Sequence, residues 1–289
     1  MNDTHSAAPQ VAILLMTYNG EQYLPQLLAS LRGQTYTRWR LYVQDDLSTD
    51  ATPRLLAEAA AADPRIEVLP RGAKYGAKGG FMHLLQHTEA DYYLFCDQDD
   101  VWLPEKVEVT LRRMHRAEAE WGKEAPLVVH TDLTVVDSEL REISPSFWRY
   151  SRIAPQLLRT FDEQAGHNLC TGCTMLLNAA ARRVSLPCPP EALMHDAWVA
   201  LSVLRSGGHV CEVDKSTILY RQHGSNTLGA HDIQTGYLRK RLSRLRSVWR
   251  ENRAHYAMLR AAGYGSAARY LYHKVAYFLR YRKLPTAKP

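Results

Sequence analysis

The sequence of 289 residues lacks long hydrophobic runs, and no basic stretch followed by an apolar one stands near its start. Its longest uninterrupted apolar run, Val11–Met16, is far too short to cross a bilayer, for which a helix needs about 20 residues. Residues 1–10 are polar, show no signal peptide and are predicted to be disordered. These absences predict a cytoplasmic protein without membrane-spanning helices.

Cysteine is scarce, and its number and spacing argue against a disulfide framework. The chain has five cysteines, an odd number, scattered from Cys96 to Cys211. Cys170 and Cys173 have the spacing of a redox or zinc pair, but no second such pair and no close histidine pair completes a site. We therefore expect buried free thiols, with a functional Cys-x-x-Cys as the alternative.

Acidic residues are almost missing from the end of the chain. Residues 231–289 contain 14 Lys and Arg but only 2 Asp and Glu, a net charge of +12. Residues 1–230 contain 22 basic and 28 acidic residues, so the overall charge of +6 conceals a mildly acidic body. This asymmetry sets residues 231–289 apart as a basic C-terminal extension that needs its own explanation.

Up to about residue 140, short apolar runs alternate with helical patterns, which predicts βαβ units, a mainly parallel sheet and the α/β class. Thr52 and Pro53 supply a helix N-cap and a proline at the first helical position. Strands are predicted over Val11–Thr17, Trp39–Val43, Arg65–Leu69, Asp91–Cys96, Leu127–Val136, Cys173–Asn178 and Val210–Tyr220, and helices over Tyr23–Leu31, Thr52–Ala62, Gly76–His87, Pro104–Arg116 and Met194–Ser206.

Polar groups follow three of the predicted strands. Thr17 ends the first strand, Asp45 and Asp46 follow the second, and the run from Asp97 to Asp100 follows the fourth. Parallel α/β sheets bind ligands just beyond the carboxyl ends of their strands. The sequence therefore predicts a ligand site at this one edge of the sheet.

Asp97 and Asp99 suit a hard divalent cation, because carboxylate oxygens are the ligands that Mg²⁺ and Mn²⁺ prefer. A cation there would bridge the carboxylates to the phosphates of a nucleotide diphosphate, which the bare carboxylates would repel. The alternative is an acidic turn in water. The apolar run that precedes Asp97 and the nearby Trp102 favour the metal site.

Three further side chains are candidates with simpler alternatives. Asp45 could accept hydrogen bonds from a nucleobase or a ribose, although Asp46 and Ser48 could equally serve only to turn the chain. Asp196 could be a general base, or an N-cap of the helix that follows. His223 could be a third metal ligand or a diphosphate donor, or simply a surface histidine.

Six motifs in this order resemble family 2 glycosyltransferases of the GT-A fold, and within them the bacterial rhamnosyltransferase-like enzymes of polysaccharide assembly. They are TYNG, QDDLSTDAT, FCDQDDVW, NLCTGCTM, MHDAW and YRQHGSN, between Thr17 and Asn226. The resemblance covers about residues 11–229. It implies a GT-A catalytic domain over residues 11–230, with a nucleotide-sugar-binding half (11–136) and an acceptor and catalytic half (137–230).

The resemblance also implies roles for single residues. Thr17 and Asp45 would contact the nucleoside, Asp97 the ribose or the metal, Asp99 and His223 the metal, and Asp196 would be the general base. The implied reaction is a metal-dependent (Mg²⁺ or Mn²⁺) single displacement that inverts the anomeric carbon of a dTDP-rhamnose or UDP-sugar donor. Two positions depart from the family, which often has Gly where Leu47 stands and Asn where Gly80 stands.

The basic C-terminal extension shows two amphipathic stretches, one over Leu238–Trp249 and one around Tyr270–Leu279. Arginine-rich amphipathic helices lie well on anionic lipid surfaces, so the extension could place the enzyme on the cytoplasmic face of the membrane, near a lipid-linked saccharide acceptor. The alternative is a helical pair that packs on the catalytic body or on a second subunit of a homodimer.

Other functions are predicted less well by the sequence. A sugar nucleotidyltransferase needs a Gly-rich loop with Arg and Lys after the first strand, and Thr17–Glu21 lacks it. A nucleic-acid-binding protein would show basic residues within a known module, and none is present, so we expect no nucleic-acid partner. A catalytically dead scaffold is disfavoured because every expected polar position is filled.

Overall fold

The computed structural model describes residues 9–167, 170–223 and 245–284. Most of the predicted disordered N-terminus and the boundary at residue 230 between body and extension lie outside the described residues. No helix in the described ranges is long and apolar enough to cross a membrane.

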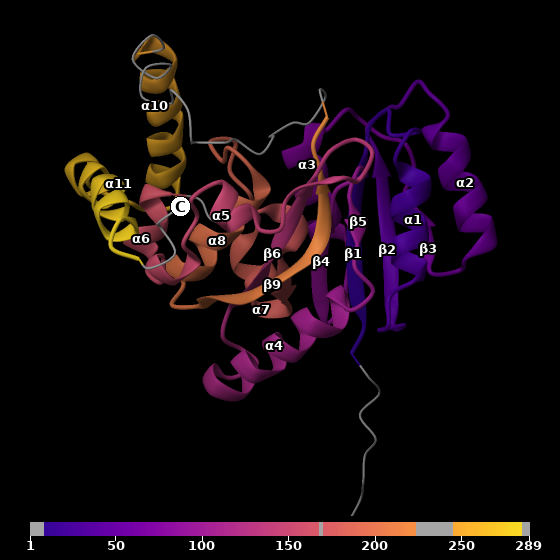
Figure 1. Cartoon of the computed structure of the whole chain (residues 1–289), viewed down its shortest axis with the longest axis horizontal. Coiled ribbons are helices and arrows are strands. Elements are labelled where there is room, and N and C mark those ends of the chain that lie inside the picture. Colours follow the sequence, from indigo (N-terminus) through magenta and orange to yellow (C-terminus); the bar gives the residue numbers. More distant parts are fainter. Residues whose placement is uncertain (1–8, 168–169, 224–244, 285–289) are drawn as a thin grey trace, which may run out of the picture.

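The described residues form a single sheet of nine strands that runs through the molecule (Figure 1). Its strands follow the order β3-β2-β1-β4-β8-β6-β9-β5, with β7 paired to β6. The first four strands of this order are parallel, whereas β8 is antiparallel to both β4 and β6. The strands are β1 (Val11–Thr17), β2 (Trp39–Asp45), β3 (Ile66–Val68), β4 (Tyr92–Cys96), β5 (Val101–Trp102), β6 (Leu127–Val136), β7 (Glu142–Ser144), β8 (Leu176–Asn178) and β9 (His209–Arg221).

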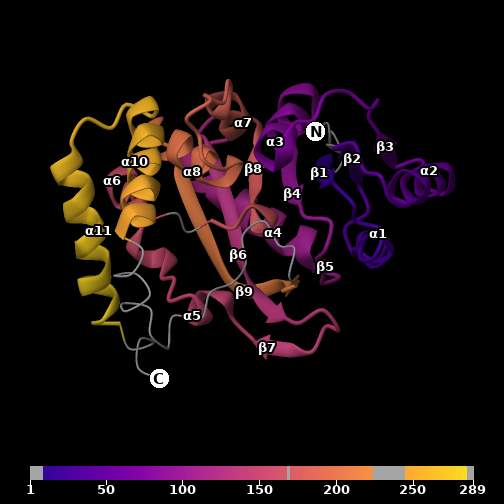
Figure 2. The same cartoon turned by 90° about the horizontal axis from the view of Figure 1, so that it is seen from above.

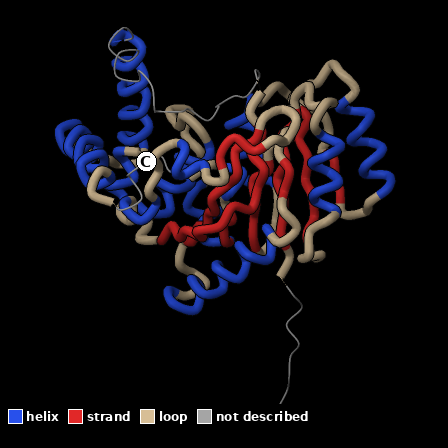
Figure 3. Tube along the Cα trace, in the orientation of Figure 1, coloured by secondary structure: helices blue, strands red, loops and turns tan. Residues whose placement is uncertain are grey.

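Helices cover both faces of the sheet (Figures 2 and 3). They are α1 (Leu24–Arg32), α2 (Thr52–Ala62), α3 (Gly76–His87), α4 (Lys106–Trp121), α5 (Phe147–Tyr150), α6 (Phe161–Gly166), α7 (Ala179–Ser185), α8 (His195–Arg205), α10 (Leu245–Ala261) and α11 (Ala267–Tyr281).

Two apolar cores follow from the alternation of side chains along the strands. Val11, Ile13 and Leu15 of β1 face α1, α2 and α4, whereas Ala12 and Leu14 face the helices of the other side. That second core contains buried side chains of α3, α7, α8 and the end of α10. The strands read as continuous apolar runs because both faces of this part of the sheet are covered.

The described part of the C-terminal extension packs on the body. Met258 and Leu259 of α10 are buried in the second core, and Tyr270 of α11 joins them. Tyr277 of α11 packs beside Leu157, and its hydroxyl accepts a hydrogen bond from the backbone of Ala154 (2.9 Å). The inner faces of both helices are therefore part of the fold.

Most predicted elements are confirmed, and β1, α2, α3 and β6 have the predicted bounds. The short strands β5 and β7 were not predicted, because two or three residues carry no periodic signal. The N-cap prediction for Thr52 was wrong: Ala51 is the N-cap, and the Thr52 hydroxyl instead accepts a hydrogen bond from the backbone of Gly20 (2.8 Å).

Gly208 allows β9 to approach β6 closely. A Cβ at this position would lie 2.1 Å from the carbonyl oxygen of Pro126, which is backbone and cannot move away cheaply. We expect Gly208→Ala to lower the free energy of unfolding by about 1–3 kcal/mol in a denaturant titration. Gly265→Ala is the matched control, because a Cβ there meets nothing within 4 Å. Equal stability of the two variants would contradict this account.

Candidate active site

The carboxyl ends of β1 and β2 lie side by side, with Thr17 opposite Asp45 in the register of the parallel pair. The Thr17 hydroxyl donates a hydrogen bond to Asp45 (3.1 Å), whose carboxylate also accepts one from the backbone of Ser48 and pairs with Arg71 (3.0 Å). Asp45 is only 2% exposed. Its carboxylate is thus held in place at the site, and its contact with a nucleoside stays a prediction.

The loop after β1 is tied to the loop after β4. The side chain of Gln98 accepts a hydrogen bond from the backbone of Tyr18 (2.8 Å) and donates one to the carbonyl of the same residue (2.9 Å). Gly20 leaves room for this pair, because a Cβ there would lie 2.3 Å from the Gln98 side chain. The middle residue of the Asp97-Gln98-Asp99 motif therefore fixes the position of its two carboxylates.

The loop after β2 contains a residue in the left-handed region. Leu47 has φ = 65° and is 39% exposed. A side chain in this conformation costs about 1–2 kcal/mol relative to glycine, which explains why a Gly suits this position in the family that the sequence resembles. Asp46, the residue before Leu47, accepts hydrogen bonds from the backbone of Tyr75 and Gly76 and so anchors the start of α3.

Asp99 and His223 meet at the carboxyl edge of the sheet. The Nε2 atom of His223 lies 2.7 Å from Oδ2 of Asp99, and the imidazole also packs against the ring of Tyr23 (4.9 Å between centroids). Both side chains are partly exposed, that of His223 by 13% and that of Asp99 by 17%. The structure thus brings together two of the three predicted metal ligands from segments 124 residues apart.

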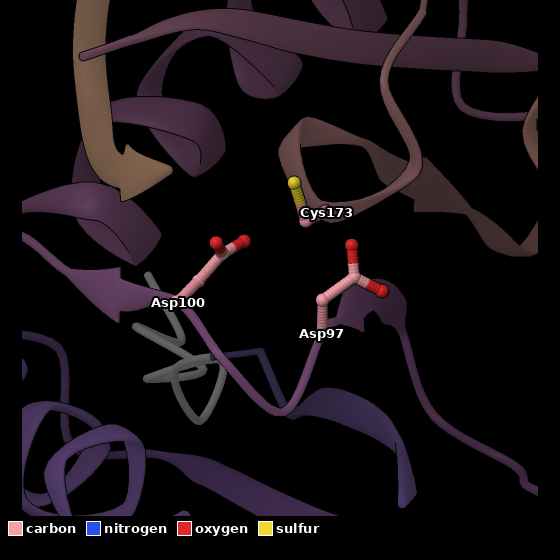
Figure 4. Close-up of side chains that lie close together, drawn as sticks. All are labelled: Asp97, Asp100 and Cys173. Carbon is pink, nitrogen blue, oxygen red and sulfur yellow. The ribbon is translucent and has the colours of Figure 1, made fainter. Parts of the chain in front are cut away.

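Asp97, the third predicted ligand, turns towards Asp100 and Cys173 (Figure 4). One potential ligand atom from each of these three side chains lies within 4.8 Å of the others. Loss of solvent and the negative charges of Asp99 and Asp196 raise the pKa of the Asp97 carboxyl to about 7. This crowding of negative charge is the condition that a bound divalent cation relieves.

Asp100 is the buried carboxylate of this group. Its Oδ1 atom accepts a hydrogen bond from the backbone of Arg221 (3.3 Å), and within the described chain its Oδ2 atom has no hydrogen-bond partner. Burial, with the charges of Asp99 and Asp97, raises the pKa of the Asp100 carboxyl well above its usual range. Cys170 and Cys173 are both buried and outside any disulfide, which confirms the prediction of buried thiols at these positions.

A buried lysine lies behind the acidic residues. Lys106 of α4 is 0% exposed, and its ammonium lies 4.5 Å from the centre of the Trp102 ring. Burial lowers the pKa of Lys106 to about 8, while the nearby Cys173, Cys96 and Asp100 oppose that change. Among the carboxylates, Asp100 is the one whose negative charge favours the charged form of Lys106.

Asp196 reaches the same site from the first turn of α8. It is 7% exposed, and its charge contributes to the raised pKa of Asp97, so the two carboxyl groups share one environment. The N-cap of α8 is Met194 rather than Asp196, whose Oδ1 atom accepts a hydrogen bond from the backbone of Ala197 (2.6 Å). The alternative in which Asp196 is the N-cap is therefore wrong, although Asp196 does bond to the first turn.

His195 is the buried first residue of α8. Its ring packs between Phe81 (4.2 Å between centroids) and Phe95 (4.6 Å). Burial lowers the pKa of His195 to about 3, so the ring is neutral at physiological pH. A Cβ on Gly172 would lie 2.5 Å from His195 Nε2, which explains why the Cys-Thr-Gly-Cys segment needs a glycine here.

Arg221, at the end of β9, holds the loop after β4 to two other segments. Its guanidinium donates hydrogen bonds to the carbonyl of Asp99 (2.9 Å), to the carbonyl of Ser138 and to the side chain of Gln26 (2.6 Å). It also lies over the ring of Tyr23 (4.5 Å). Sequence reasoning placed Gln98 and Asp100 in the polar run after β4 but gave no individual role to them or to Arg221, because their partners are distant in the chain.

A cavity of about 660 Å³ lies away from this site. Its lining includes Pro9 and Asp91, which precede β1 and β4, so it opens at the amino ends of the parallel strands. The hydroxyl of Tyr92 donates a hydrogen bond to Glu118 in its wall (2.8 Å). The predicted site residues at the carboxyl ends of the strands lie at the opposite edge of the sheet. The candidate active site is therefore identified by these polar side chains and not by the cavity.

We expect Arg221→Lys to weaken both the fold and the site, because a lysine retains the charge but cannot span three acceptors with a planar fork. The loss of buried charge-assisted hydrogen bonds should lower the free energy of unfolding by about 2 kcal/mol or more in a urea titration. Arg141→Lys is the matched control, since Arg141 is 77% exposed in its ion pair with Asp137. A similar small effect for both variants would show that Arg221 does not hold the loop.

Comparisons with solved structures agree with this architecture. The mannosyltransferase PcManGT from Pyrobaculum calidifontis, in complex with GDP-Man and Mn²⁺, superposes with a TM-score of 0.55 at 17% identity, over 98% of this chain and 84% of that one. S. aureus TarS 1-349 in complex with UDP-GlcNAc also gives 0.55 at 17% identity, over 79% of this chain. The match spans only 61% of that TarS chain. At these identities the likeness concerns the fold.

Sequence comparison identifies the family. The dTDP-rhamnosyl transferase RfbG of Shigella flexneri is 28% identical over 252 residues, which are 81% of this chain and 80% of that protein. The model of glycosyl transferase family 2 matches residues 12–183, well over half of the chain. This match spans the strand ends that carry Thr17, Asp45, Asp97 and Asp99, and it excludes a sugar nucleotidyltransferase as the better description. The chain belongs to glycosyl transferase family 2.

Proposed function

We propose that this glycosyltransferase moves a sugar from a nucleotide-diphosphate donor to a hydroxyl of a saccharide acceptor, with inversion at the anomeric carbon. The observation that carries the proposal is the shared environment of Asp97 and Asp196 at the carboxyl edge of the sheet. A carboxylate that can hold a donor cation and a carboxylate that can take a proton thus lie at one site, on elements from opposite halves of the chain.

Asp97, Asp99 and His223 would hold Mg²⁺ or Mn²⁺, and the bound cation would neutralise the diphosphate as it leaves. The crowded carboxylates, the raised pKa of Asp97 and the contact between Asp99 and His223 support this assignment. The same side chains are oxygen and imidazole donors, which both ions accept. PcManGT, which shares the fold, was solved in complex with Mn²⁺, and this agrees with a cation in the present site.

Asp196 would act as the general base, accepting the proton of the acceptor hydroxyl while the hydroxyl oxygen attacks the anomeric carbon. Its place in the first turn of α8 supports this role, because the positive end of the helix dipole favours a negative charge there. Attack opposite the leaving diphosphate breaks the bond to the donor in one displacement and inverts the configuration.

Thr17 and Asp45 would contact the nucleoside, and Arg71 joins them as a residue that the sequence did not suggest. Arg71 is 48% exposed on its side chain and pairs with Asp45, so it offers donors to a ligand while its partner stays buried. The compared proteins differ in base and sugar: RfbG is a dTDP-rhamnosyl transferase, TarS was solved with UDP-GlcNAc and PcManGT with GDP-Man. Thermal-shift screening against these three donor classes, with and without Mn²⁺, identifies the donor used here.

The acceptor would be a lipid-linked saccharide in cell-surface polysaccharide synthesis, met on the cytoplasmic face of the membrane. The net charge of +12 over residues 231–289 supports this location. The homodimer stays an alternative partner for the same residues.

We expect Asp99→Ala to lose at least about 100-fold in turnover and most of its metal-dependent affinity for nucleotide, because one of the cation's carboxylate ligands is gone. The fold should persist, since the Asp99 side chain is partly exposed. Calorimetric titration with dTDP or UDP, with Mn²⁺ or with EDTA, measures the affinity. Asp214→Asn, an exposed acid on β9, is the control. Equal nucleotide affinity of the unaltered protein in EDTA and in Mn²⁺ would remove the metal from the proposal.

We expect Asp196→Asn to reduce turnover by roughly 10²–10⁴-fold with unchanged donor affinity. Asparagine keeps the shape of the side chain and its acceptor oxygen for the Ala197 backbone, so only the base is lost. Turnover should be measured at saturating donor, alongside the calorimetric affinity. Near-normal turnover would mean that Asp196 serves only the first turn of α8.

A further inference from the structure

An exposed apolar stripe runs along the outer face of α11. It consists of Leu271, Tyr272, Val275, Phe278 and Leu279, each between 45% and 67% exposed. Their spacing of one, three and four residues places all five on one side of a helix. In the part of the chain that the structure describes, only four other large apolar side chains are exposed, and they are scattered over the body.

The orientation of α11 is fixed by its inner face, so the stripe cannot simply turn inwards. Tyr277 bonds to the backbone of Arg152 (3.1 Å), and the Lys274 ammonium donates to Asn252 of α10 (2.6 Å). Near the two ends of the helix, Arg269 pairs with Asp162 and Arg280 pairs with Glu163, both residues of α6. Figures 1 and 2 show α11 at the outer edge of the molecule, with α6 and α10 between it and the sheet.

We propose that the stripe on α11 is the surface by which this enzyme lies on an anionic lipid bilayer, with the helix parallel to the membrane plane. The inference deepens the proposed function, on which it rests for the membrane location, by naming the lipid-contacting residues. Leu, Val, Phe and Tyr side chains suit the boundary between headgroups and acyl chains. Tyr272, the most exposed of the five, has the amphipathic ring that is enriched at that depth.

Charge favours lipid as the occupant. Arg282 and Lys283 are exposed directly after the stripe, and they belong to an extension with 14 basic and 2 acidic residues. Anionic headgroups complement such a surface, whereas a second copy would bring an equal positive charge against it. This repulsion counts against a dimer through α11.

The size of the stripe also favours lipid. A stable interface between proteins takes about 20–30 residues on each side, and the stripe supplies five. Interfacial helices, by contrast, bind with a narrow apolar face inserted to a shallow depth. The face is therefore too small for a stable dimer and sufficient for peripheral membrane contact.

The test compares two charge-neutral sets of substitutions in the full chain. Leu271→Gln, Val275→Gln and Leu279→Gln together replace the three aliphatic side chains of the stripe while keeping good helix formers. Ile143→Gln with Leu193→Gln is the matched control, because both side chains are exposed apolar residues elsewhere on the body. Binding is measured by co-sedimentation with vesicles of phosphatidylcholine and phosphatidylglycerol, and with vesicles of phosphatidylcholine alone, without donor or metal.

We expect the unaltered protein and the control to bind the anionic vesicles, and the triple variant to bind them about tenfold or more weakly. Binding of the unaltered protein to phosphatidylcholine alone should be weaker by a similar factor. Equal binding by the triple variant overturns the inference. So does a dimer of the unaltered protein, seen by light scattering, that the triple variant lacks while neither binds vesicles. Tyr272→Gln alone serves as the second variant if the triple variant has a lower melting temperature.

Because vesicle binding is measured without substrate, its outcome is independent of catalysis. Loss of turnover in Asp196→Asn with normal vesicle binding would leave both proposals standing. Normal transfer chemistry without vesicle binding would overturn only the assignment of α11.

Discussion

Repulsion among carboxyl groups is the constraint around which the active edge of the sheet is built. The charges of Asp99 and Asp196 raise the pKa of Asp97, and those of Asp99 and Asp97 raise the pKa of Asp100, in a site that solvent screens poorly. Lys106 of α4 and the end of β9 bring positive charge and hydrogen-bond donors to the same place. The fold thus tolerates a negative site by enclosing it between distant segments, and a divalent cation would relieve the remaining repulsion.

The sequence predicted the strands and the polar strand ends well, because buried parallel strands leave uninterrupted apolar runs. Val11–Thr17 and Leu127–Val136 were found at their observed bounds for this reason. What escaped prediction depends on contacts across the sheet. The amide of Gln98 on the backbone of Tyr18 and the fork of Arg221 carry no local signal, since each side chain is specified by a partner more than 70 residues away.

The C-terminal extension was likewise predicted only in part from the sequence. Helical periodicity and basic composition predicted two amphipathic stretches beyond residue 230, but periodicity alone could not say which face is covered. The structure resolves this for α11: Tyr270 and Tyr277 are buried against the body, while Leu271 and Val275 face solvent. The two sequence alternatives, packing on the body and contact with a membrane, are therefore compatible, because opposite faces of one helix can serve both.

The sheet order has a mechanical consequence. β5 comes from the segment that follows the Asp97-Gln98-Asp99 motif, yet it pairs with β9 from the second half of the chain, and β8 is inserted between β4 and β6. Strands from the two halves therefore alternate within a single sheet, and the halves are not joined by a hinge. They cannot swing as separate lobes without breaking backbone hydrogen bonds, so closure around substrates falls to the loops. The distance between the polar strand ends of the first half and the start of α8 in the second half is then set by the sheet itself.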